Sequence, residues 1–121
     1  MKKLRIIILS LLLAVLLFAG IESAFAQYPL VTNVSPLYQE VSTYPWQAKW
    51  NQSISSGDSP FDISILWGDG TNWYEYINQP YWSYTWYRSY FVPAGTKYQT
   101  FKTEDNYGEV VYKYTSVKVI K

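Results

Sequence analysis

The chain has 121 residues, enough for one domain, and its 10 basic and 9 acidic residues give a net charge of +1, without the basic excess that binding to a phosphate backbone requires. It contains no Cys and no His, which excludes disulfides, thiolate chemistry and the commonest zinc ligand and general base. Aromatic residues make up 20% of the chain (6 Trp, 13 Tyr and 5 Phe), so a disordered or coiled-coil protein is excluded as well.

The first 26 residues are typical of a secretory signal peptide. A basic start precedes an apolar run over residues 6–19, and the small residues Ala24 and Ala26 lie in front of a cleavage site. The run is short for a membrane-spanning helix, which needs about 20 apolar residues, although an uncleaved anchor is the alternative. We predict that residues 1–26 are removed and that residues 27–121 form one secreted domain that does not insert into a membrane.

Beyond the signal, apolar and polar residues alternate with a period of two, which is typical of half-buried strands. Strands are predicted at 31–34, 37–41 (after a break at Ser35-Pro36), 46–54, 61–67, 81–92, 97–104 and 110–120. Turn-forming clusters separate them at 55–60, 68–70, 93–95 and 105–108. This spacing predicts an all-β, two-sheet antiparallel sandwich, with Trp46, Trp50, Ile65 and Trp67 in its core.

Three motifs point to a known family. The string Ile65-Leu66-Trp67-Gly68-Asp69-Gly70-Thr71 resembles the signature of PKD (polycystic kidney disease) domains, with Ile65-Leu66 where that family usually has Trp-Asp. Downstream, Tyr90, Pro93, Gly95 and Tyr98 are similar to its Tyr…Pro-x-Gly-x-Tyr passage, with Lys97 as one extra residue before Tyr98, and residues 105–108 resemble its last hairpin. The resemblance covers roughly residues 44–120. It implies an immunoglobulin-like sandwich used outside the cell as a non-catalytic binding or spacer module, and it identifies no ligand.

The acidic residues have a structural and a functional interpretation. Gly68-Asp69-Gly70 is expected to be a structural turn, with the Asp69 carboxylate bonded to nearby amides. The alternative is a cation site that Asp69 forms with Asp58, Asp62 or Asp105. No catalytic residue, metal or cofactor is predicted, because no His is present to activate a Ser nucleophile, no phosphate-binding Gly-rich loop occurs, and nothing indicates a cleft between paired carboxylates.

The stretch between Asn72 and Phe91 is the strongest functional lead, because ten of its 20 residues are aromatic. A strand with rings on both faces cannot bury both in a two-sheet fold, so some rings should be exposed, and exposed aromatic patches mark binding sites. The alternative is an ordinary core strand with Tyr on its surface. The predicted ligand-binding residues are Trp73, Trp82, Tyr84, Trp86 and Arg88, with Asn72, Asn78 and Gln79 as polar neighbours.

Two kinds of partner suit such rings. A sugar ring stacks its apolar C–H face on Trp or Tyr, so a polysaccharide or cell-wall glycan is the leading ligand class. The alternative is an adhesive, matrix or inhibitor protein whose partner is another protein, because Trp, Tyr and Arg dominate interface hot spots. Nucleic acid is disfavoured, because stacking platforms for it are accompanied by a positive groove, whereas residues 27–121 carry seven basic and eight acidic side chains. The oligomeric state is left open.

Overall fold

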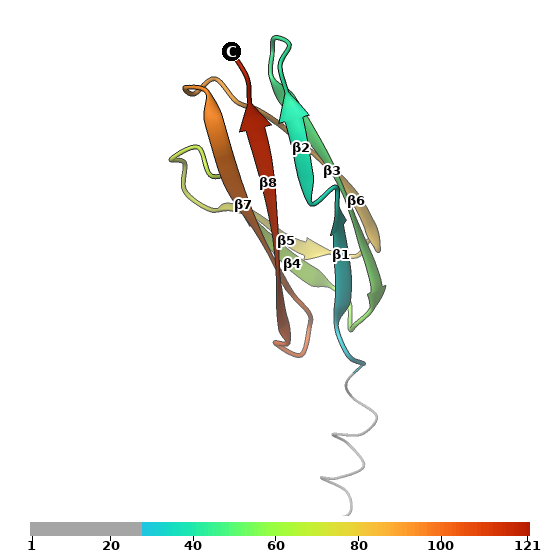
Figure 1. Cartoon of the computed structure of the whole chain (residues 1–121). Helices are drawn as coiled ribbons and strands as arrows, with labels where there is room; N and C mark the ends of the chain where they lie inside the picture. The colour runs from blue at the N-terminus through green and yellow to red at the C-terminus, as the bar shows by residue number, and fades with distance from the viewer. Residues whose placement is uncertain (1–27) are drawn as a thin grey trace, which may run out of the picture.

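The structure is a computed structural model that describes residues 28–121, so the predicted signal peptide lies outside the described residues. This part of the chain forms eight β-strands in two facing sheets (Figure 1). It contains no helix, and hence none of a length and apolarity that would cross a membrane. The strands are β1 (Val31–Ser35), β2 (Tyr38–Val41), β3 (Gln47–Ser56), β4 (Phe61–Leu66), β5 (Tyr74–Gln79), β6 (Ser83–Ser89), β7 (Gly95–Glu104) and β8 (Val110–Val119).

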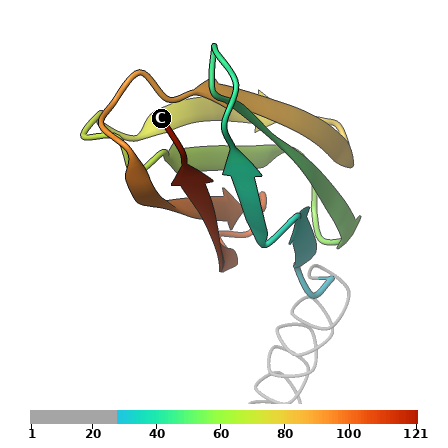
Figure 2. The ribbon, with the colours of Figure 1, turned by 45° about the horizontal axis from the view of Figure 1, so that its top comes forward.

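The predicted all-β, two-sheet architecture is confirmed, with one correction to its strand directions. One sheet has the order β1-β3-β6 and the other the order β2-β8-β7-β4-β5 (Figure 2). The pairs are antiparallel except for β2 and β8, which run parallel. The break at Pro36 explains this exception, because proline cannot donate to a ladder: β1 ends there, and β2 continues in the opposite sheet beside β8.

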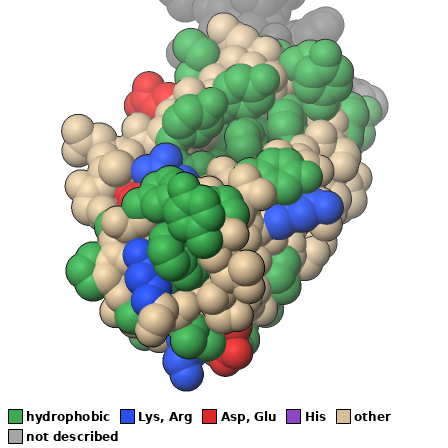
Figure 3. All heavy atoms as spheres, turned by 90° about the horizontal axis from the view of Figure 1, so that it is seen from above, with side chains coloured by type: hydrophobic (Ala, Val, Ile, Leu, Met, Phe, Trp, Pro, Cys, Tyr) green, Lys and Arg blue, Asp and Glu red, His purple; other side chains and the backbone are tan. Residues whose placement is uncertain are grey.

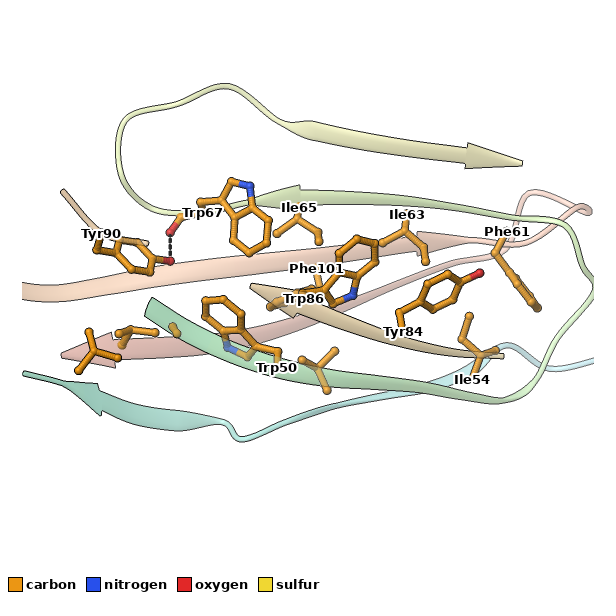
Figure 4. Close-up of a cluster of buried hydrophobic side chains, with 14 of the residues drawn as sticks. Trp50, Ile54, Phe61, Ile63, Ile65, Trp67, Tyr84, Trp86, Tyr90 and Phe101 are labelled. Atoms are coloured by element: carbon orange, nitrogen blue, oxygen red, sulfur yellow. Dashed lines mark hydrogen bonds between the residues drawn. The ribbon is translucent and has the colours of Figure 1, made fainter. Parts of the chain in front are cut away.

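The core lies between the sheets and is rich in aromatic rings (Figure 4). Trp50, Ile65 and Trp67 are buried in it as predicted. Trp46 is only partly buried, which corrects its assignment to the core. It precedes β3 in a left-handed backbone conformation (φ 51°), at the end of the sandwich, where its ring packs edge-on against Tyr44.

Three of the buried rings join the two sheets. The ring of Trp50 on β3 lies 5.5 Å from that of Trp67, which follows β4, and 5.8 Å from that of Phe101 on β7. Trp67 and Phe101 are themselves 6.3 Å apart in an edge-on arrangement. Because large aromatic side chains bury the most apolar area of any residue type, this group supplies a cross-sheet attachment in a chain without cysteine.

Two buried glutamines add polar connections inside the core. The Gln52 amide donates to the Thr32 hydroxyl (3.1 Å) and the Thr103 hydroxyl (2.8 Å), and its oxygen accepts the Trp86 indole N–H (2.9 Å). The Gln99 amide donates to the Tyr90 hydroxyl (2.9 Å). Gln52 therefore links both sheets through β1, β3, β6 and β7, and its satisfied polar atoms make its burial tolerable.

Tyr90 follows the last residue of β6 and also connects the two sheets. Its hydroxyl donates to the Trp67 carbonyl at 2.8 Å, the dashed contact in Figure 4. Burial raises the pKa of the Tyr90 phenol well above its ordinary value, so the hydroxyl stays protonated and keeps donating across the whole physiological range.

β5 is a strand that the alternation did not predict. It is the edge strand of the five-stranded sheet and pairs only with β4. Its residues are exposed, apart from the half-exposed Gln79, so it lacks the buried-and-exposed pattern that reveals a strand in sequence. The following strand, β6, is shorter than the predicted 81–92 and begins at Ser83.

Candidate functional site

The aromatic stretch between residues 72 and 91 does not form a single binding surface. Tyr84 and Trp86 are only 8% and 9% exposed, so the expectation that they belong to an exposed ring platform is wrong. Both face the opposite sheet from β6, their rings stack 5.6 Å apart, and the Trp86 indole is bonded to Gln52. Burial also raises the pKa of the Tyr84 phenol. These two rings hold the sandwich together.

The other three predicted residues lie in three separate places. Trp73 (42% exposed) lies before β5, on the outer side of the five-stranded sheet. Trp82 (46% exposed) lies before β6, beside the loops that follow β3 and β7. Arg88 lies near the far end of β6, where its guanidinium contacts Asp69. A joint role of these side chains at one ligand is therefore not supported by their geometry.

Asp69 organises the turn that follows β4. One carboxylate oxygen accepts the backbone N–H and the hydroxyl of Thr71, and the other accepts the Arg88 Nε–H at 2.8 Å and forms an ion pair with Arg88 Nη2 at 2.7 Å. The preceding Gly68 has a left-handed backbone (φ 76°), and a Cβ there would collide with the backbone of Tyr98. Only glycine fits this close approach, and the Arg88 ion pair ties the turn to the three-stranded sheet.

The Asp69 carboxyl has a shifted pKa. Burial by itself would raise the pKa, but the hydrogen bonds from Thr71 and Arg88 outweigh it, and the pKa lies below its ordinary value. A lowered folded-state pKa stabilises the protein above the unfolded-state pKa of about 4, and this contribution is lost as the pH falls through the folded-state value.

Replacing Asp69 by alanine is therefore expected to lower the free energy of unfolding by about 1–3 kcal/mol at pH 7. The difference from the parent should shrink below about pH 4, and Asp69→Asn, which keeps an oxygen for Thr71, should cost less. Urea denaturation at pH 7 and pH 3 measures both effects.

Calcium should change the stability of neither the parent nor Asp69→Ala, because in residues 28–121 no three acidic side chains come together as a metal site. Stabilisation of the parent alone by calcium would contradict this structural role.

The outer faces of the two sheets differ sharply in composition. On the three-stranded sheet, β3 and β6 present mainly polar side chains, and Tyr87 is the only aromatic one among these strand residues. The five-stranded sheet instead presents a set of rings that are 42–72% exposed. This aromatic face, as we call it, consists of Tyr38, Trp73, Tyr98, Tyr112 and Tyr114.

Strand pairing sets the layout of the aromatic face. Tyr112 and Tyr114 are two residues apart on β8, which places them about 7 Å apart along the strand. Ser116 pairs with Tyr98 on β7 and with Tyr38 on β2, so these two rings stand on either side of β8, about 10 Å apart. The rings thus form a band that follows β8 along the sheet.

Trp73 extends this band across the sheet through a shallow hollow. The hollow has a volume of about 310 Å³ and is lined by Trp73, Tyr112, Ser64, Glu75 and Lys102. Ser64 on β4 pairs with Glu75 on one side and Lys102 on the other, and Lys102 pairs with Tyr112. A carboxylate, a hydroxyl and an ammonium group therefore lie in one row, with an aromatic ring near each end.

The tyrosines of this face were missed by the sequence interpretation, which considered only the densest aromatic stretch. A signal was present in residues 110–120. Tyr112 and Tyr114 lie at the same alternate positions as the polar Ser116 and Lys118, whereas the apolar Val117 and Val119 take the positions between them. Alternation alone therefore places these tyrosines on the outer side of their sheet.

A third aromatic cluster caps the end of the sandwich where the chain ends. Tyr44 and Phe91 are exposed and lean on the partly buried Trp46, with ring centroids 5.3 and 6.3 Å from it. Lys121 lies 4.1 Å from the centre of the Trp46 ring. Figure 3 looks down on this end and shows hydrophobic side chains gathered there between basic ones. The cluster covers the core, and a hollow lined by Arg88, Tyr87 and Phe91 adjoins it.

Comparison with known proteins adds no relative. No protein-family model matches the chain, and no curated protein matches it. The resemblance to PKD domains stays a prediction from its motifs.

Proposed function

We propose that this protein is a secreted, non-catalytic binding module that uses the aromatic face to hold polysaccharide or cell-wall glycan. The contrast between the two outer faces carries this proposal. A sheet face that meets only water is normally polar, as on the three-stranded sheet. The partly exposed rings on the other sheet make an apolar surface of the kind that marks interaction sites.

The chemistry of the Trp73 hollow favours a sugar as the ligand. Trp73 and Tyr112 offer flat apolar surfaces for the C–H faces of sugar rings, which gain from leaving water. Between them, the Glu75 carboxylate accepts hydrogen bonds, Lys102 donates them and the Ser64 hydroxyl does both, as sugar hydroxyls require. Repeated rings along β8 would let a long chain add several weak contacts on one molecule.

The fold is further proposed to be immunoglobulin-like and of the PKD type. Its sheets separate β1, β3 and β6 from β4, β7 and β8, as the strands of immunoglobulin-like sandwiches are separated. In antibody domains, whose strands are lettered A to G in chain order, a Trp packs on a disulfide between strands B and F. Here Trp67 packs on Trp50 and Phe101. These two residues lie on β3 and β7, the strands that correspond to B and F.

Binding is tested with protein recovered from the culture medium. The intact mass of this protein should correspond to residues 27–121. Co-sedimentation with cellulose, chitin and peptidoglycan should show affinity for at least one of them. Trp73→Ala and Tyr112→Ala should each weaken that affinity about tenfold. Tyr87→Ala is the matched control, since it removes an exposed ring from the opposite sheet and should change nothing.

The same experiment separates the two ligand classes. A protein partner captured from the secreted fraction by the parent, together with no affinity for any of the three polysaccharides, would reject the glycan proposal. Equal weakening by Tyr87→Ala would reject the aromatic face as the binding surface. Circular dichroism of each variant checks that the exposed substitutions leave the fold intact.

A further inference from the structure

A third hollow lies at the end of the sandwich where the described chain begins, the lower end in Figure 1. The β3–β4 loop, the residue before β6, and the β7–β8 loop meet there with the N-terminal segment. This loop hollow, as we call it, has a volume of about 540 Å³, within the range of known ligand sites. Its lining residues are Tyr28, Ser55, Ser56, Gly57, Asp58, Ser59, Trp82, Asn106 and Tyr107, and none of them belongs to the aromatic face.

Backbone contacts hold the loops of this hollow in place. The Asn106 N–H donates to the Asp58 carbonyl at 2.8 Å, which ties the β7–β8 loop to the β3–β4 loop. The Tyr28 N–H donates to the Asp58 carboxylate at 2.9 Å. Within the β7–β8 loop, the Asp105 carboxylate accepts the N–H groups of Tyr107 and Glu109 at 3.0 and 2.9 Å. The hollow is thus largely preformed, which would reduce the ordering cost of taking up a ligand.

Trp82 is a fixed wall of the loop hollow. Its ring packs edge-on against the buried Phe61, with centroids 5.0 Å apart, and its carbonyl accepts the Ile54 N–H at 2.8 Å. The ring is nevertheless 46% exposed. It therefore offers a rigid aromatic surface to solvent, and Tyr28 and Tyr107 stand exposed around it.

The charges of the lining decide which ligands fit. Among residues 28–121, Asp58 is the only charged side chain that lines it, and no Lys or Arg takes part. A phosphate, sulfate or uronic acid would meet a carboxylate and no cation, which is unfavourable. A neutral ring or one that carries an amine would meet serine hydroxyls, the Asn106 amide and a carboxylate, all suited to hydrogen bonds with sugar hydroxyls.

We propose that the loop hollow is a second glycan site, which takes the end of a neutral or amine-bearing sugar chain, while the aromatic face binds along the side of the chain. The ligand class rests on the proposed function, but the site is a different one. The loop hollow is open to solvent and bordered by loops at the end of the domain, and its volume of about 540 Å³ limits it to one or two sugar rings. The band along β8 is open at both ends and follows a longer chain.

The test is titration of ¹⁵N-labelled protein with short soluble sugars, followed through indole and backbone resonances. The probes are cellobiose, N,N′-diacetylchitobiose and the disaccharide of glucosamine, with a galacturonic acid disaccharide as the anionic control. At least one of the first three should shift the Trp82 indole signal and the backbone signals of Asn106 and Tyr107. The corresponding six-ring oligomer should bind the loop hollow within about twofold of the disaccharide, because only its end enters.

Variants separate this site from the aromatic face. Trp82→Ala should weaken disaccharide binding about tenfold. If Trp82→Ala unfolds the protein through loss of its contact with Phe61, Asn106→Ala replaces it as the test variant, because the Asn106 side chain is exposed. Asp58→Asn keeps an oxygen for the Tyr28 N–H and should weaken the glucosamine disaccharide more than cellobiose. Trp73→Ala should leave the Trp82 response unchanged.

The proposal is overturned if no probe shifts Trp82, if the shifts occur only around Trp73 and Tyr112, or if the galacturonic acid disaccharide binds best. Failure of the aromatic-face proposal has a different signature. In that case Trp73→Ala would sediment with polysaccharide as well as the parent does, whatever the resonances of the loop hollow show.

Discussion

Replacing Trp50 by alanine is expected to lower the free energy of unfolding by about 3–5 kcal/mol. Trp50 is fully buried and contacts Trp67 and Phe101 from the opposite sheet, so its removal leaves a cavity in the middle of the core. Small domains have a total stability of only about 5–15 kcal/mol. The variant should therefore unfold at a much lower urea concentration than the parent, or fail to accumulate.

A milder substitution at the same site checks the reason for this loss. The Trp50 indole N–H has no hydrogen-bond partner among the described residues, so Trp50→Phe removes an unpaired donor while it keeps most of the ring contacts. It should cost much less than alanine. Trp73→Ala is the exposed control and should melt close to the parent. Equal stability of Trp50→Ala and Trp73→Ala would show that the core is assigned wrongly.

Replacing Gln52 by alanine is expected to cost about 3 kcal/mol. The Gln52 side chain satisfies the Trp86 indole and the hydroxyls of Thr32 and Thr103 in the buried interior. Without it, a buried donor is left unpaired and a cavity opens, and each effect is destabilising. Urea unfolding, followed by tryptophan fluorescence, measures the change.

Two further variants distinguish the hydrogen bonds of Gln52 from its volume. Gln52→Leu restores most of the volume and should recover part of the loss, since only the polar partners then stay unpaired. Gln52→Leu combined with Trp86→Phe also removes the unpaired indole and should be more stable than the sum of the single changes predicts. Simple additivity in this cycle would contradict the coupling of Gln52 to Trp86.

Alternation was sufficient to predict the strands that have one buried face. β3 and β4 show the pattern in almost every residue, and they carry the correctly assigned Trp50 and Ile65. Alternation was insufficient for Gln52. This residue points to the same side of β3 as Trp50 and Ile54, but it is polar. Its burial depends on hydrogen-bond partners from β1, β6 and β7, which are far apart in the sequence. Trp46 shows the same limit, since a left-handed turn moves it out of its strand.

The candidate site depends on which rings face outward, and this was only partly predictable. Tyr84 and Trp86 belong to the stretch with the most aromatic residues, yet the three-stranded sheet places them against the core. The rings of the aromatic face come from β2, β7, β8 and the residue before β5. Their common surface arises from strand pairing between distant segments, including the parallel pair of β2 and β8. No local pattern contains that information.

The central claim is that the aromatic face touches the glycan, and hydroxyl-radical footprinting on the polysaccharide-bound protein tests it most directly. Peptide mass analysis then compares the oxidation of each exposed ring with and without polysaccharide. Tyr38, Trp73, Tyr98, Tyr112 and Tyr114 should be protected, while Tyr87 on the three-stranded sheet keeps its free-protein rate. Protection of Tyr87 with unchanged oxidation of Trp73 and Tyr112 would contradict the claim.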